Sequence, residues 1–235
     1  MDFKGIKDLI VNSKVLGKGS YGYVLLRDDK AYKIDRIIYE NFQKEDMKEA
    51  SLKEMLKYSR LGFLKLPDEN LMNYYNSIRD NVRYTKLPTG ILYYEDTPLL
   101  LEMPYHKDYV TLSLAFLMDD EIYRVLFNLS KAFQELIRNK VYQMDLCYGN
   151  NIMVNELTRD VQLIDLDGEY IKYGDDNYAK KQAYSEFFNV VYLWLRDLDV
   201  RVDTNYFQGR NIQDVKNMLY HTSQVLKKEG KFYSK

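Results

Sequence analysis

Residues 141–168 decide the fold and read VYQMDLCYGNNIMVNELTRDVQLIDLDG. Two short apolar runs, 152–154 and 161–164, flank a polar turn, a pattern typical of two short paired strands. Asp145 lies in a polar loop before the first run, and Asp165 follows the second run directly. We therefore expect an aspartate loop and an Asp-x-Asp turn to meet at one edge of a small sheet.

The polar residues of this stretch include side chains that a hard cation prefers. Asn150 and Asn151 offer amide oxygens, and Asp165 and Asp167 offer carboxylates. Mg²⁺ takes one or two carboxylates from a protein and fills its shell with phosphate oxygens and water. Asp145 is then left to orient a hydroxyl nucleophile, as phosphoryl transfer requires.

The composition is that of an ordinary globular chain. The protein has 235 residues, of which 46% are hydrophobic and 29% charged, and a formal net charge of −1. This length allows a single domain or two closely joined lobes with an ample core. The balanced charge does not indicate binding to nucleic acid or to an anionic membrane.

Compartment signals in the sequence are few but agree with one another. Cys147 is the one cysteine, which excludes an intramolecular disulfide framework and favours a reducing compartment. The first residues, MDFK, do not start a signal peptide, and no apolar run approaches the length of a membrane span. We expect a cytoplasmic protein that binds neither nucleic acid nor a membrane.

A glycine-rich segment lies near the amino end, where Gly17, Gly19 and Gly22 are flanked by apolar and β-branched residues. This pattern predicts a strand, a glycine-rich turn and a second strand that contains Val24. A dinucleotide-binding fingerprint needs a helix directly after the glycines, and a Walker A loop needs Gly-Lys-Ser/Thr, so neither fits. What remains is a hairpin whose backbone N–H groups can approach phosphates closely.

The strand after this hairpin carries Ala31 and Lys33 on one face. A small residue beside a lysine suits an adenine ring and its phosphates. Residues 39–61 then show helical spacing, with Glu54 on a partly apolar stripe. A buried glutamate without a cation would be costly, so Lys33 is its natural partner. Glu49 is the alternative partner.

The remaining pattern separates strands from helices along the chain. Strands are expected at 87–95 and 98–103, and amphipathic helices at 119–139, 184–198 and 212–228. The first of these helices leads directly into the Asp145 loop.

The order and spacing of these motifs resemble those of the protein-kinase-like phosphotransferases. The resemblance covers about residues 13–198. It is carried by Gly17-x-Gly19-x-x-Gly22-x-Val24, Ala31-x-Lys33, the helix with Glu54, Asp145 with Asn150, and Asp165-Leu166-Asp167-Gly168. It implies an α+β, bilobal protein-kinase-like fold. Residues 1–103 would form an N-lobe with an antiparallel sheet, and residues 104–235 a mainly helical, shortened C-lobe, together one kinase-like domain.

By position, the resemblance implies a role for each motif and names ATP and Mg²⁺ as cofactors. Lys33 would hold the α- and β-phosphates and pair with Glu54, and Asp145 would be the catalytic base or orient the hydroxyl. The residues expected to bind the nucleotide are Leu16, Gly17, Gly19, Gly22, Val24, Ala31, Lys33, Glu102 and Met103. The residues expected to bind the metal are Asn150, Asp165 and Asp167, with Asn151 replacing Asn150 if the loop carries one inserted residue.

Several positions depart from the family pattern. Gln143-Met144 stands where protein kinases usually have His-Arg, and Cys147 where Ser/Thr kinases have a lysine. Asp167 replaces the glycine of Asp-Phe-Gly, as in the aminoglycoside and choline phosphotransferases. In a hinge formed by residues 102–104, with Leu101 as gatekeeper, Pro104 would lack the N–H that donates to adenine.

Three functions are therefore expected, in this order. The first is an ATP- and Mg²⁺-dependent kinase that phosphorylates a hydroxyl on a protein, in the manner of Ser/Thr kinases. The second is a small-molecule kinase of the aminoglycoside or choline phosphotransferase type, which Asp167 and Cys147 favour. The third, a non-catalytic pseudokinase-like binding module, is least favoured, because a decayed site usually loses a motif residue and this chain keeps all four: Lys33, Asp145, Asn150 and Asp165.

Overall fold

The structure is a computed structural model that describes residues 1–20, 22–58, 64–146, 149–167 and 170–230. Cys147 and Gly168 lie outside the described residues. The chain divides into two compact units. Unit 1 consists of Met1–Ser77, Leu87–Tyr105 and Asp167–Glu169, and unit 2 of Ile78–Lys86, His106–Leu166 and Tyr170–Lys235.

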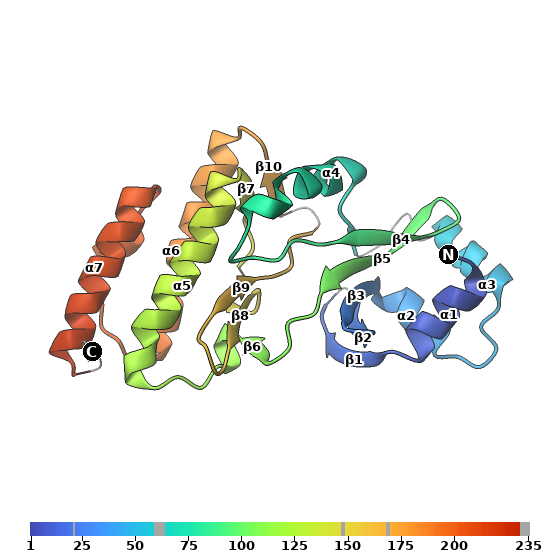
Figure 1. Ribbon diagram of the computed structural model, residues 1–235, viewed down its shortest axis with the longest axis horizontal. Coiled ribbons are helices and arrows are strands. Elements are labelled where there is room, and N and C mark those ends of the chain that lie inside the picture. Colours follow the sequence, from blue (N-terminus) through green and yellow to red (C-terminus); the bar gives the residue numbers. More distant parts are fainter. Residues whose placement is uncertain (21, 59–63, 147–148, 168–169, 231–235) are drawn as a thin grey trace. The chain divides into compact units, whose positions relative to one another are not determined.

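Unit 1 is built on an antiparallel sheet with the strand order β1-β2-β3-β5-β4 (Figure 1). The strands are β1 (Lys14–Lys18), β2 (Gly22–Arg27), β3 (Lys30–Asp35), β4 (Gly90–Tyr94) and β5 (Thr97–Pro104). Asp28 and Asp29 join β2 to β3 with φ of 50° and 58°. Aspartate tolerates this left-handed conformation better than most residues, which makes a tight hairpin possible.

Helices cover one face of this sheet. They are α1 (Phe3–Val11), α2 (Arg36–Phe42) and α3 (Glu49–Tyr58). Asp2 begins α1 by accepting the N–H of Gly5 at 2.8 Å, and Asp35 begins α2 by accepting the N–H of Ile37 at 2.8 Å. The core between helices and sheet contains Ile6, Leu9, Ile10, Leu25, Tyr32, Ile34, Ile38, Phe42, Met47, Leu52, Tyr94, Leu99 and Leu100.

A further helix, α4 (Glu69–Ile78), follows in the chain and continues into the short 3-10 helix η2 (Arg79–Asn81). The sequence analysis did not predict it. Its buried side chains are those of Leu71, Met72, Tyr75 and Ile78. This spacing of three and four residues is helical, but the run is short and bounded by polar residues.

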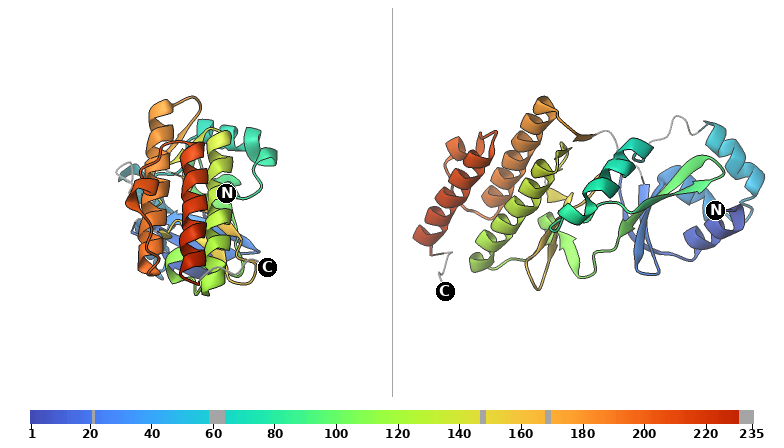
Figure 2. Two further views of the ribbon diagram at one scale, coloured as in Figure 1. Left: turned by 90° about the vertical axis from the view of Figure 1, so that its left-hand side faces the viewer. Right: turned by 45° about the horizontal axis from the view of Figure 1, so that its top comes forward.

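Unit 2 is dominated by α5 (Asp119–Arg138), α6 (Asn177–Asp197) and α7 (Ile212–Lys228), which lie side by side in Figures 1 and 2. The ring of Phe133 on α5 stacks on that of Phe187 on α6, with 4.3 Å between centroids. Phe133 also meets Tyr184 edge-on at 5.2 Å. The 3-10 helix η5 (Thr204–Phe207) joins α6 to α7.

Two small sheets in unit 2 carry the stretch that opened the sequence analysis. In one, β6 (Tyr109–Thr111), β8 (Ile152–Asn155) and β9 (Val161–Leu163) pair in the order β6-β8-β9. The 3-10 helix η3 (Leu112–Leu114) follows β6. In the other, β7 (Val141–Gln143) pairs with β10 (Ile171–Tyr173). The predicted hairpin is therefore present, with Ile152 opposite Leu163.

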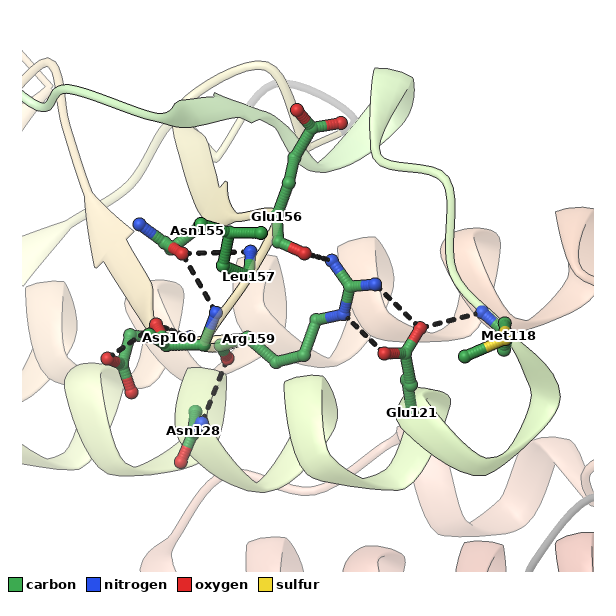
Figure 3. Close-up of polar contacts among 9 residues, drawn as sticks. Met118, Glu121, Asn128, Asn155, Glu156, Leu157, Arg159 and Asp160 are labelled. Atoms are coloured by element: carbon green, nitrogen blue, oxygen red, sulfur yellow. Dashed lines mark hydrogen bonds and ion pairs between the residues drawn. The ribbon is translucent and has the colours of Figure 1, made fainter.

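An arginine fixes the β8–β9 hairpin against the start of α5 (Figure 3). Nε and Nη2 of Arg159 each lie 2.8 Å from an oxygen of Glu121, and Asn128 donates to the Arg159 carbonyl at 2.9 Å. The two charged side chains are only 12% and 18% exposed. A two-point pair of this kind sets orientation as well as distance, so it fixes the strands that precede the Asp-x-Asp turn.

The α+β class expected from the sequence is confirmed by this structure, which has an antiparallel five-stranded sheet. Within the described ranges, no helix has the length and apolar character needed to cross a membrane.

Candidate functional site

One face of the unit 1 sheet combines aliphatic side chains with a lysine. Strand pairing places Val24 and Leu101 opposite Lys33, and Leu26 and Met103 opposite Ala31. Directly opposed residues in antiparallel strands share a face, so these side chains lie together on the face opposite the helical core. An apolar surface that ends in an ammonium group suits a flat base with phosphates attached.

The two predicted hinge residues differ in where their side chains lie. Met103 is opposite Ala31 and shares its face. Glu102 belongs to the other face, where its carboxylate contacts Lys30 at 3.0 Å and accepts from the Thr89 hydroxyl at 2.9 Å. The Glu102 carbonyl also accepts the N–H of Thr89 at 2.9 Å. Because β5 extends to Pro104, residues 102–104 belong to the sheet.

The glycines of the first hairpin have different reasons to be glycine. A Cβ at Gly22 would lie 2.3 Å from the Ile34 carbonyl oxygen, so strand packing requires glycine there. A Cβ at Gly17 would meet nothing within 4 Å, and one at Gly19 only the Gly22 oxygen at 3.7 Å. Neither has a positive φ. A ligand approaching the backbone would account for both, which is how phosphates bind glycine-rich turns.

Lys33 forms an ion pair with Asp167 and not with the predicted helix glutamate. The Lys33 ammonium lies 3.1 Å from Oδ1 of Asp167. Glu54 is exposed and, within the described part of the chain, forms no ion pair with Lys33. The alternative, Glu49, accepts from the Tyr94 hydroxyl at 2.6 Å and pairs with Lys53 at 3.4 Å.

The expected Lys33–Glu54 pair is not found because the sequence analysis assigned the wrong inner face to α3. The buried and half-buried side chains of α3 are Leu52, Met55 and Leu56. Glu54 lies outside this stripe, and α3 begins only at Glu49. The prediction used apolar residues from 39–61, a range longer than the helix at both ends. It therefore assigned the wrong inner face, one that included Glu54.

In unit 2, side-chain amides fix the backbone at Asp145. The buried Gln143 donates through Nε2 to the Ile164 carbonyl at 2.7 Å and to the Asp145 carbonyl at 3.5 Å. Asn151 donates through Nδ2 to the same Asp145 carbonyl at 2.8 Å. The Ile164 N–H in turn donates to the Asn151 carbonyl at 3.0 Å. The Asp145 loop and the residue before Asp165 are thus held in one hydrogen-bonded network.

This network distinguishes the two candidate asparagines. Asn150 is exposed, and its Oδ1 already accepts from the Ser113 hydroxyl at 3.0 Å. Asn151 uses its amino group on the Asp145 carbonyl, and no donor among the described residues reaches its Oδ1. An amide anchored through its nitrogen leaves its oxygen to accept, so these contacts favour Asn151 over Asn150 as the candidate ligand.

Asp165 adopts a left-handed backbone, with φ of 60°. Asp28 and Asp29 share this conformation, which aspartate tolerates better than most residues, so it does not by itself mark a functional turn. Among the described residues, no group of three or more His, Cys, Asp or Glu side chains could hold a metal ion. Mg²⁺ bound to a nucleotide does not need such a group, because phosphates complete its shell. Asp165 and Asn151 fit that smaller requirement.

The sequence analysis missed two residues that lie near candidate aspartates, one near Asp167 and one near Asp145. Tyr75 of α4 is fully buried, and burial, followed by the charge of Asp167, raises the pKa of its phenol. Glu186 of α6 has a raised pKa because it is partly buried and lies near the charge of Asp145. The spacing of buried residues in α4 was the available signal for Tyr75; no local signal marked Glu186.

No known family profile matches this chain, and no curated protein is significantly similar to it in sequence.

Proposed function

We propose that this protein is an ATP- and Mg²⁺-dependent phosphotransferase that moves the γ-phosphoryl group of ATP to a hydroxyl. The observation that carries the proposal is the sheet face with Ala31, Met103 and Lys33, together with a hairpin in which Gly17 and Gly19 have no packing reason to be glycine. The aliphatic part would bind adenine, and the hairpin N–H groups and Lys33 the phosphates. The motif order supports the same assignment.

The residues of unit 2 would supply the metal and the acceptor chemistry. Asp165 and Asn151 would hold Mg²⁺, which would supply positive charge to neutralise the charge that develops on the phosphates. Asp145 would orient the acceptor hydroxyl and take its proton. The Gln143 and Asn151 amides hold its backbone in place, and such positioning accounts for much of phosphoryl-transfer catalysis.

The acceptor is most simply a protein hydroxyl in the cytoplasm, a setting that the single cysteine favours. A small-molecule hydroxyl is the second candidate. It is favoured by Asp167, which stands where protein kinases have glycine and whose side chain is only 4% exposed.

The proposal is tested by incubation with labelled ATP and Mg²⁺, first alone, then with a generic protein, an aminoglycoside or choline. Lys33→Met should reduce transfer by at least about 100-fold, because it removes a charge that positions the phosphates. Lys30→Met is the matched control, since Lys30 lies on the same strand but contacts Glu102. Unchanged turnover in folded Lys33→Met protein would rule out this assignment.

A second experiment separates the two acids. Asp145→Asn should lower kcat far more than it weakens ATP binding, because Asp145 acts on the acceptor. Asp165→Asn should instead raise the Mg²⁺ concentration needed for ATP binding, because Asp165 is assigned to the metal. Nucleotide titrations at several Mg²⁺ concentrations, beside steady-state rates, distinguish the two roles. The opposite pattern would mean that the roles are exchanged.

A further inference from the structure

We propose that Asp167 is the counter-ion that positions Lys33 for the nucleotide phosphates, in place of a glutamate from a helix. This inference rests on the proposed function and assigns Asp167 as a positioning residue. It differs from the metal-binding role expected from the sequence. The direct observation is the distance of 3.1 Å between the Lys33 ammonium and Oδ1 of Asp167.

Burial makes this pair more than a surface contact. The Asp167 side chain is 4% exposed and that of Lys33 17%. Exposed ion pairs contribute little to stability, whereas removing one partner of a buried pair leaves a charge without compensation. Lys33 extends from β3 on the face proposed for the nucleotide, so a fixed Asp167 also fixes where the ammonium lies.

Other unit 1 carboxylates near the sheet are engaged elsewhere. Glu49 bonds to Tyr94 and Lys53, and Glu102 bonds to Lys30 and Thr89. Asp35 caps α2, and Glu54 is exposed. Asp167, by contrast, lies directly on the Lys33 ammonium.

The surroundings of Asp167 support a fixed role. Tyr75 of α4 is fully buried close enough for the Asp167 charge to affect its phenol, so Asp167 lies in a poorly hydrated environment. The Oδ1 atom of Asp167 accepts from the Lys33 ammonium there, so the structure assigns Asp167 to Lys33 and not to the metal. Asp165 and Asn151 are the residues that the proposed function assigns to the metal.

The test is a double-mutant cycle read by the binding of a fluorescent ADP analogue, first in EDTA and then across a Mg²⁺ series. Lys33→Met and Asp167→Asn should each weaken binding in EDTA by about tenfold, and the double variant no more than Lys33→Met alone, because interacting residues are not additive. The Mg²⁺ concentration for half-maximal binding should not change in Asp167→Asn. Glu54→Gln is the matched control and should bind as the parent protein does.

Several outcomes would overturn the inference. Additive losses would show that the two residues act separately. A raised Mg²⁺ requirement in Asp167→Asn with intact binding in EDTA would make Asp167 a metal ligand. A loss in Glu54→Gln equal to that in Asp167→Asn would restore Glu54 as the partner. Asp167→Glu, which keeps the charge, should recover part of the binding lost in Asp167→Asn.

Thermal unfolding without nucleotide tests the Lys33–Asp167 pair independently of the proposed function. Lys33→Met removes the ammonium that lies on the buried Asp167 carboxylate, so the double variant should melt at a higher temperature than Lys33→Met. This result is expected even if the parent protein neither binds nucleotide nor transfers phosphate, which would refute only the proposed function. A double variant that melts below Lys33→Met would refute the pair itself.

Discussion

At the scale of single residues, the position of Lys33 depends on strand register. Side chains alternate along a strand, so a slip by one residue would move Lys33 into the helical core and Tyr32 out of it. Lys33 pairs with Val24 of β2 on one side and with Leu101 of β5 on the other, so both neighbouring strands fix the register of β3. The prediction that Ala31 and Lys33 share a face followed from this alternation, and the structure confirms it.

His106 is a second residue whose environment has a measurable consequence. Burial, followed by the charge of Lys86, lowers the pKa of its imidazole to about 4. In the unfolded chain His106 takes up a proton near pH 6.5, whereas in the folded protein it does so only near pH 4. Its contribution to stability is therefore complete above about pH 6.5 and is lost as the pH falls toward 4.

We predict that His106→Gln flattens the pH dependence of unfolding between pH 4 and 6.5. The parent protein should lose on the order of 1–2 kcal/mol more than the variant over this range, after allowance for partial exposure. Denaturant titrations at pH 4.5, 5.5 and 7 measure the difference, in which the carboxylates shared by both proteins cancel. Parallel curves for the two proteins would contradict the assigned cause.

At the scale of elements, periodicity predicted the long amphipathic helices best. The helix predicted at 212–228 has the bounds of α7, and that at 119–139 differs from α5 by one residue. The helix predicted at 184–198 begins earlier, at Asn177, because Asp176 caps it by accepting the N–H of Ala179 at 2.8 Å. Its first turns are largely polar, so the apolar pattern could not reveal them.

Site contacts between distant parts of the chain were harder to predict. Lys33 and Asp167 are 134 residues apart, and only the folded backbone of unit 1 brings them together. The choice between Asn150 and Asn151 likewise depended on which side chain reaches the Asp145 carbonyl. Motif spacing could name these residues, but it could not assign their partners.

Backbone hydrogen bonds hold residues 170–174 against residues 140–144. Strand β10 pairs with β7, and the Met144 N–H donates to the Tyr170 carbonyl at 3.0 Å. The Gly174 N–H donates to the Lys140 carbonyl at 3.0 Å. In many protein kinases an arginine before the catalytic aspartate binds a phosphorylated loop, and in the proposed alignment with that family Met144 takes its place.

We therefore predict that the proposed kinase activity needs no phosphorylation in residues 170–181. The hydroxyls of this segment belong to Tyr170, Tyr173 and Tyr178, all of them exposed. Phosphatase treatment, with mass spectrometry to show that these tyrosines are unmodified, should leave the rate within about twofold. A tenfold loss, about 1.4 kcal/mol of barrier, restored by phosphorylating one of these tyrosines, would contradict the prediction.

At the scale of the whole molecule, the chain divides into two compact units, each with buried aromatic side chains. In unit 1, Phe42 is 1% exposed and lies in the core between the sheet and the first helices. In unit 2, Phe187 is fully buried and stacks on Phe133. Each phenylalanine therefore reports on one interior, and removing either ring leaves a cavity in that unit alone.

We predict that these cavities loosen the two units selectively. Phe42→Ala and Phe187→Ala should each cost about 3–5 kcal/mol, the usual range for removing a buried ring. Hydrogen exchange read by mass spectrometry should accelerate in α1, β2 and β3 for Phe42→Ala, and in α5 and α6 for Phe187→Ala, because local opening follows local packing. The two variants serve as controls for each other. Equal acceleration throughout the chain in both would show instead that it unfolds as a single cooperative body.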